Sequence, residues 1–254
     1  MTLILTHINK YGIILASDSN LTNNEGNTGF GQKVFPIPHL NSALTYSGNY
    51  SINGKSIDLW MTNFITGSFF TCKTIEQFTS ELSNRMTSEM RDEEINAVSI
   101  VHVCGYQVYN NISYLEHWHI SNGTLSNDGN YSKAINQFHF CNDFNTRTVD
   151  QHREILNKLN EDSTYHQFYI NGFPPGRMGI MHIKQVMDKA LKEIWNHEEW
   201  GFRKPQNIFE VASTLEFYFE LVALLFKMSN YNALYIGGKT QLHIIPVPQN
   251  INTF

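Results

Sequence analysis

The sequence predicts an α+β protein built as a four-layer α/β/β/α sandwich with two antiparallel sheets. Two observations predict this class: short β-rich runs are joined by turns of only three or four residues, and apolar faces at helical spacing separate groups of strands. Turns that short join only antiparallel neighbours. Two sheets with helices packed on their outer faces would bury every one of these apolar faces.

The first strands are expected as two hairpins. Residues 3–8 and 13–19 are joined by the turn "NKYG", and residues 33–37 and 42–48 are joined by "PHLN". The intervening residues 20–32 are polar and rich in Gly and Asn, so they are expected to be an irregular connection. Four strands therefore precede the first helix.

Two helices are expected next. Apolar residues recur at intervals of three and four over residues 57–65, and at every fourth position over residues 78–90. Thr74 with Gln77 is typical of a capping box, in which each residue satisfies a free backbone donor at the start of the second helix.

The rest of the chain returns to strands, then helices, then strands. The Asn/Asp/Ser-rich residues 122–164 receive no regular structure and are expected to be a surface excursion, and residues 171–179 are expected to be a Pro/Gly-rich turn. The other expected elements are strands at 95–105, 106–112, 114–123, 232–236 and 241–247, and helices at 183–195 and 207–228. Without repeats or a low-complexity linker, residues 1–254 are expected to form a single domain.

Composition argues against several classes of partner. The 254 residues carry 18 Lys+Arg and 23 Asp+Glu, for a formal charge of -5, without a clustered basic run. Such a chain lacks the basic field that attracts phosphate backbones, so no nucleic-acid partner is expected. The first residues, "MTLILTHINKYG", lack the features of a secretory signal, so a cytoplasmic location is expected.

The most apolar stretch is residues 208–226, which contains Glu210, Glu216 and Glu220. Each Glu would cost roughly 2.5 kcal/mol or more at the middle of a bilayer, so a buried helix and no membrane partner are expected.

Cysteine and histidine spacing gives no support for a metal. Cys72, Cys104 and Cys141 lie far apart without CxxC spacing, which favours free thiols. His117 and His119 alternate along a strand and so face one side, but no third ligand stands at a useful spacing. No metal and no other cofactor are therefore expected.

Thr2 directly follows the initiator Met. If Met1 is removed, a single residue carries both a hydroxyl nucleophile and a free α-amine, whose pKa of ~8 lets it accept the hydroxyl proton at neutral pH.

The segment "TLILTHINKYGIILASDSNLT", followed by "KVFPI" and "LTYSGNYSINGKSIDLW", resembles the N-terminal half of proteasome β-type subunits, which are N-terminal-nucleophile (Ntn) threonine peptidases. The ending "YIGGKTQLHII" looks like the Anbu branch of bacterial proteasome-like proteins. The resemblance implies Thr2 as nucleophile, an Asp18–Lys33 pair that tunes it, and Gly48 as oxyanion donor. Lys33 stands one place earlier than in the family, a difference that one deletion in the preceding loop would explain.

Gly48 ends a strand and is expected just before a helix, where fixed dipoles would stabilise an oxyanion by ~3 kcal/mol. By the same resemblance, Thr22 lies near an extended-peptide groove, and Leu21, Tyr46 and Tyr50 line a specificity pocket. Two tyrosines would favour apolar or aromatic substrate side chains, although each could equally be a core residue.

Three functions are consistent with this sequence. The first is a threonine protease of the proteasome type, acting on peptides or unfolded proteins and assembled as a homo-oligomeric ring or open ring, as the resemblance implies. The second is a non-catalytic assembly scaffold, because the stretch before the Gly pair lacks the Asp of active subunits and offers only Ser229, Asn230 and Asn232. The third is an Ntn amidase for a small amide.

Overall fold

The computed structural model describes residues 2–23, 26–95, 97–109, 112–125, 131–142, 154, 157–159, 167–230 and 236–248. These residues form an α+β fold with two main antiparallel sheets. One sheet has four strands in the order β12-β1-β2-β13, and the other has five in the order β11-β10-β9-β6-β5.

The strands of the four-stranded sheet are β1 (Leu3–Asn9), β2 (Gly12–Ser17), β12 (Gln167–Gly172) and β13 (Gln241–Pro246). Those of the five-stranded sheet are β5 (Val34–Ile37), β6 (Ser42–Ser47), β9 (Ile100–Tyr109), β10 (Ile112–Leu125) and β11 (Tyr131–Asn142). Two small hairpins pair β3 (Asn20–Asn23) with β4 (Gly26–Phe30), and β7 (Ser51–Ile52) with β8 (Lys55–Ser56). The helices are α1 (Ile57–Thr71), α2 (Ile75–Glu89), α3 (Asp92–Ile95), α5 (Pro174–Asn196) and α6 (Ile208–Lys227), with 3-10 turns at Pro38–Leu40 and Glu198–Trp200.

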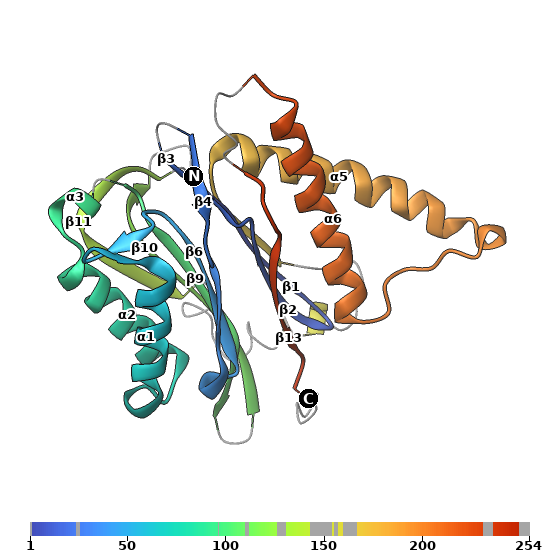
Figure 1. Ribbon diagram of the computed structural model, residues 1–254. Helices are drawn as coiled ribbons and strands as arrows, with labels where there is room; N and C mark the ends of the chain where they lie inside the picture. The colour runs from blue at the N-terminus through green and yellow to red at the C-terminus, as the bar shows by residue number, and fades with distance from the viewer. Residues whose placement is uncertain are drawn as a thin grey trace.

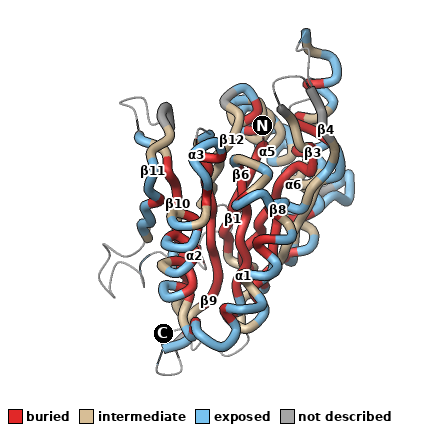
Figure 2. Tube along the Cα trace, turned by 60° about the vertical axis from the view of Figure 1, so that its left-hand side comes forward, coloured by how far each residue is buried: buried red, intermediate tan, exposed pale blue. Residues whose placement is uncertain are grey.

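The helices contact the two sheets separately. Helix α2 packs on β9, β10 and β11, whereas α5 contacts β12 and α6 contacts β2 and β13. Figure 1 shows α1 and α2 at one side of the molecule and α5 and α6 at the other. The buried segments in Figure 2 follow the strands, and the exposed ones follow the helices and connections.

Three apolar clusters correspond to these contacts. One joins the five-stranded sheet to α1 and α2, and includes Trp60, Phe78 and Trp118. A second joins the four-stranded sheet to α5 and α6. The third takes residues from both sheets, among them Leu15 and Cys104, so side chains of the two sheets pack against each other.

Both expected hairpins of the first half are confirmed, as β1–β2 and β5–β6. The capping box is confirmed with one shift. Thr74 Oγ1 accepts the N–H of Gln77 at 3.1 Å, but Gln77 Oε1 accepts the N–H of Lys73, at 2.8 Å, rather than that of Thr74. Asn207 caps α6 in the expected place, through the N–H of Glu210.

Several expected boundaries were wrong. The connection at 20–32 contains β3 and β4, and eight strands rather than four precede α1. Residues 95–123, expected as three strands, contribute to the two long strands β9 and β10.

The later boundaries also differ from expectation. The excursion at 122–164 contains the end of β10 and the whole of β11, while β12 was not expected. Helix α5 begins at Pro174, inside the expected turn, because Pro fits the first helical positions, whose N–H groups have no partner within the helix.

Of the expected strand 232–236, residues 232–235 lie outside the described part, and Ile236 is buried but not in a strand. None of the helices in the described part combines the length and apolarity needed to cross a bilayer. Cys72, Cys104 and Cys141 are free thiols.

Candidate active site

Asp18 is the centre of the candidate site. It directly follows β2, and the antiparallel pairing of Ile4 with Ser17 brings it beside the start of β1. Its Oδ1 accepts the N–H of Leu3 at 2.9 Å and the ammonium of Lys33 at 3.3 Å. The side chain is buried, so these contacts are shielded from water. Asp18 therefore links the residue after Thr2 directly to Lys33.

The second carboxylate oxygen of Asp18 is also occupied. Its Oδ2 accepts the backbone N–H groups of Asn20 at 3.2 Å and Gly237 at 3.4 Å. Burial raises the pKa of the Asp18 carboxyl, and the charge of Lys33 and the N–H donors of Leu3 and Gly237 oppose that rise. Three backbone donors and one ammonium satisfy a carboxylate, so we treat Asp18 as ionised.

Lys33 directly precedes β5, and it is buried. Besides Asp18, its ammonium donates to the backbone carbonyl of Asn20 at 2.5 Å. Burial lowers the pKa of Lys33 below its usual range, and Asp18 opposes this effect. Because the Asp18 carboxylate lies beside it, we treat Lys33 as the charged ammonium.

Gln241 of β13 holds the backbone of this segment in place. Its Oε1 accepts the N–H groups of Lys33 at 2.7 Å and Val34 at 3.2 Å, and its Nε2 donates to the carbonyl of Gly31 at 2.7 Å. One side chain of the four-stranded sheet therefore holds the edge strand of the five-stranded sheet.

Thr2 is buried, and its carbonyl accepts the N–H of Phe173 at 2.8 Å. The backbone of Gly172 passes so close that a Cβ there would lie 1.9 Å from this carbonyl oxygen, and Gly172 has φ +119°. β12 therefore fixes Thr2 through backbone contacts. Thr2, Asp18 and Lys33 are brought together at one end of the four-stranded sheet.

Gly48 immediately follows β6, but not at a helix N-terminus. The β7–β8 hairpin intervenes, and α1 begins only at Ile57, so the expected helix dipole at Gly48 was wrong. Gly48 has φ +154°, and a Cβ there would lie 2.2 Å from Ser99 Oγ. It is connected to the pair through β6, where the N–H of Tyr46 donates to the carbonyl of Lys33 at 2.9 Å.

The expected substrate residues lie in different environments. Leu21 and Thr22 are half-buried in β3, and the Leu21 side chain would contact a Cβ added to Gly31. Tyr46 belongs to the apolar cluster with α1 and α2, whereas Tyr50 is 52% exposed. The role of these residues in substrate binding stays a prediction.

The hydroxyl of Tyr46 holds the turn after Gly48. It donates to the carbonyl of Asn49 at 2.6 Å and lies 3.1 Å from Ser99 Oγ. Glu94 fixes the next turn, because its carboxylate accepts the N–H groups of Asn53 and Gly54. These bonds and others from Arg91 outweigh partial burial and lower the pKa of Glu94 to about 2.

Two of the three polar residues that could stand in for the missing Asp, Ser229, Asn230 and Asn232, lie in the described part of the chain. Ser229 donates its hydroxyl to the carbonyl of Phe226 at 2.7 Å, at the end of α6. Asn230 is the last described residue before the gap, and Asn232 lies outside the described residues.

Four contributors to the site were not predicted from the sequence: Asn20, Ser99, Gly237 and Gln241. Asn20 and Gly237 act through their backbones, and Ser99 packs against Gly48. The Gly pair in "IGGKT" was the one available signal, because glycines allow a chain to approach another closely.

His117 and His119 face the same side of β10, as expected, and both rings lie within 5.3 Å of the His102 ring, centroid to centroid. His102 is buried, and its ring nitrogens contact Thr6 Oγ1 at 3.1 Å and Asn171 Nδ2 at 2.8 Å. The described residues contain no group of three or more His, Cys, Asp or Glu arranged to hold a metal ion.

The burial of His102 predicts that the folded protein loses stability at acid pH. Burial lowers the pKa of His102 well below its usual range, and His117 and His119 lower it further. The folded protein then binds fewer protons than the unfolded chain below a pH of about 6.5, so stability falls as the pH falls, by up to ~1.4 kcal/mol per pH unit for this group. Among the described residues, those that contact or pair with His102 are Thr6, Thr45, His117, His119 and Asn171, none of which is acidic.

Urea unfolding between pH 7 and pH 5 checks this prediction. His102→Gln removes the histidine whose pKa is lowered most and is expected to reduce the dependence of the free energy of unfolding on pH, to which the half-buried His243 contributes with the same sign. The control His182→Gln, at an exposed histidine, is expected to keep the full dependence. An unchanged slope in His102→Gln would show that another group causes the acid sensitivity.

Comparison of the chain with known protein families and with curated protein sequences finds no match.

Proposed function

We propose that this protein is a threonine hydrolase of the N-terminal-nucleophile type that cleaves peptide bonds with Thr2 after removal of Met1. The observation that carries the proposal is the buried Asp18–Lys33 pair, whose carboxylate also binds the N–H of the residue that follows Thr2. Structural ion pairs are seldom buried this completely, and strongly perturbed groups cluster at functional sites.

We infer in addition that the two sheets and their helices are stacked as a four-layer α/β/β/α sandwich of the proteasome-like class. The contacts of α2 with one sheet, of α5 and α6 with the other, and the apolar cluster drawn from both sheets support this arrangement. A homo-oligomeric ring or open ring belongs to the same proposal.

In the proposed reaction, the free α-amine of Thr2 takes the proton of its hydroxyl as Oγ attacks the peptide carbonyl. The N–H of Gly48 donates to the oxyanion. The C–N bond then breaks, and the leaving amine takes the proton. Water hydrolyses the Thr2 ester and releases the acid. Lys33 lowers the pKa of the amine through its charge, and Asp18 holds Lys33.

One observation favours the non-catalytic alternative. Of the two polar stand-ins that the structure describes, Ser229 uses its hydroxyl at the end of α6, and Asn230 is exposed. A scaffold would keep the fold and its assembly surfaces without orienting the amine of Thr2.

The mass of the intact protein, before and after treatment with a peptide epoxyketone, tests the proposal. Such a probe needs both the hydroxyl and the free amine of an N-terminal Thr. We expect loss of Met1 and a single adduct on the wild type, slower labelling of Thr2→Ser, and no adduct on Thr2→Ala. Retained Met1 without an adduct would overturn the peptidase proposal and leave the scaffold.

A further inference from the structure

A cavity lies at the far end of β1 from Thr2. It has a volume of about 350 Å³ and lies between the β1–β2 turn, α5, α6 and the segment before α6. At ~3.3 Å per residue, the length of β1 places Asn9 about 20 Å from Leu3. The cavity is therefore separate from the candidate active site.

The inner wall of this cavity is apolar. Leu215 and Tyr218 of α6 are buried there, and Trp195 and Leu191 of α5 complete the wall. Tyr218 directs its hydroxyl to Asp188 Oδ1 at 3.1 Å. An apolar wall with an aromatic ring favours a ligand with an aromatic or aliphatic body.

The rim of the cavity is cationic. Four lysines line it, against a single acidic residue: Lys10, Lys184, Lys192 and Lys204 against Asp188. Asp188 forms an ion pair with Lys184 and also accepts the Tyr218 hydroxyl.

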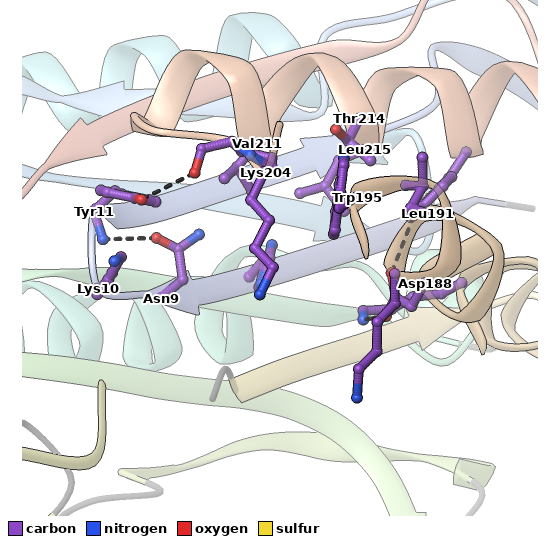
Figure 3. A pocket seen from close by; sticks show the side chains of 15 residues that line it. Asn9, Lys10, Tyr11, Asp188, Leu191, Trp195, Lys204, Val211, Thr214 and Leu215 are labelled. Carbon is purple, nitrogen blue, oxygen red and sulfur yellow. Dashed lines mark hydrogen bonds and ion pairs between the residues drawn. The ribbon is translucent and has the colours of Figure 1, made fainter. Parts of the chain in front are cut away.

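No described carboxylate lies within ion-pair distance of Lys192 or Lys204. Figure 3 shows Lys204 reaching into the space between Asn9 and Trp195. Two ammonium groups are therefore available to an anion, although the whole chain has a formal charge of -5.

Asn9 adds a donor that lacks an acceptor. The residue is only 9% exposed, and its Oδ1 accepts the N–H of Tyr11 at 2.8 Å. The amide nitrogen Nδ2 has no hydrogen-bond partner among the described residues. In Figure 3 this nitrogen is turned away from Tyr11, toward the side where Lys204 lies. Buried amide groups are normally paired, so an N–H donor without a partner in a cavity that Lys192 and Lys204 also line indicates a missing acceptor.

We propose that this cavity binds a small organic anion, with the carboxylate, sulfonate or phosphate at Asn9, Lys192 and Lys204 and the apolar body against Trp195, Leu215 and Tyr218. The charge selects an anion, and the apolar wall selects against inorganic ions. This proposal is independent of the chemistry at Thr2.

Isothermal titration calorimetry of the full-length protein with naphthalene-2-carboxylate tests the site. Lys204→Gln and Lys192→Gln are each expected to raise Kd about 10-fold, since each loses a charge-assisted contact. Lys189→Gln, on α5 but outside the cavity, is the matched control and should leave Kd within about 2-fold. Asn9→Asp keeps the acceptor for Tyr11 but adds a repelling carboxylate, so it should abolish binding while the melting curve shows a folded protein.

Two further titrations make the outcome decisive. Inorganic phosphate, which has no apolar body, should bind much more weakly than the naphthoate. The uncharged naphthalene-2-carboxamide should also bind more weakly. No binding of the naphthoate at millimolar concentration, equal binding of the carboxamide, or equal Kd values in Lys204→Gln and Lys189→Gln would each overturn the proposal.

Discussion

Lys33→Met is expected to lower the free energy of unfolding by about 3–5 kcal/mol, because it leaves the buried Asp18 carboxylate without its ammonium partner. The Met side chain has nearly the length of Lys, so loss of packing contributes little. The carboxylate keeps the N–H donors of Leu3, Asn20 and Gly237, but these do not neutralise its charge. Urea unfolding at pH 7 measures the change.

Two controls isolate the pair. Lys55→Met, at an exposed lysine of β8, should change stability by less than ~0.5 kcal/mol. Asp18→Asn combined with Lys33→Met removes both charges and should recover a large part of the loss. A Lys33→Met protein as stable as the Lys55→Met protein would show that the pair is not the source of stability at this site.

Gly48→Ala is the second substitution with a large expected effect. The new Cβ would lie 2.2 Å from Ser99 Oγ and 2.7 Å from Ser99 Cα, so β6 and the segment before β9 must move apart. The backbone of Gly48, at φ +154°, is also one that Ala rarely adopts. Steric strain of this kind costs ~1–3 kcal/mol, and the overlap adds to it. We expect a lower melting temperature and, if the proposed reaction occurs, loss of epoxyketone labelling.

Gly67→Ala is the matched control for this prediction. Gly67 lies in α1 with no neighbour within 4 Å of an added Cβ, so Ala should stabilise the helix by ~0.5–1 kcal/mol. Thermal unfolding of both variants distinguishes a local clash from a general effect of the substitution. A Gly48→Ala protein that unfolds at the same temperature as the wild type would contradict the packing described around Ser99.

Local signals predicted the parts of the fold that depend on neighbouring residues. The turn "NKYG" predicted the β1–β2 hairpin, the cap at Thr74 predicted the start of α2, and the apolar residues after Asn207 predicted α6. In each case a few consecutive residues contain the whole determinant, namely a turn, an oxygen acceptor or an apolar period.

Elements that depend on distant partners could not be predicted in this way. Strand β12 is stabilised by pairing with β1, and the paired residues lie 159 (Ile8 with Gln167) to 169 (Leu3 with Gly172) positions apart in the chain. β11 lies at the edge of its sheet, and β3–β4 is a two-stranded ribbon of Asn and Gly, so neither shows a strong apolar alternation. Their strand conformation depends on cross-strand hydrogen bonds that composition does not reveal.

In the candidate site, too, some contributors could be predicted from the sequence and others could not. The resemblance pointed to Asp18 and Lys33, and the structure places them in contact. The contributions of Asn20 and Gly237 come from backbone groups, which any residue type carries, so apart from the Gly pair in "IGGKT" no sequence pattern pointed to them. Gly48 was expected directly before a helix because the β7–β8 hairpin, which separates it from α1, has only two residues in each strand and so no recognisable period.

Gln241 also affects whether another chain can add a strand to the five-stranded sheet. β5 is an edge strand, and free N–H groups on an edge invite another chain to add a strand. At the entrance to β5, the amide of Gln241 already occupies the N–H groups of Lys33 and Val34. This end of the edge is thus closed to strand addition by a side chain of the same molecule, which protects the chain from aggregation beside its candidate site.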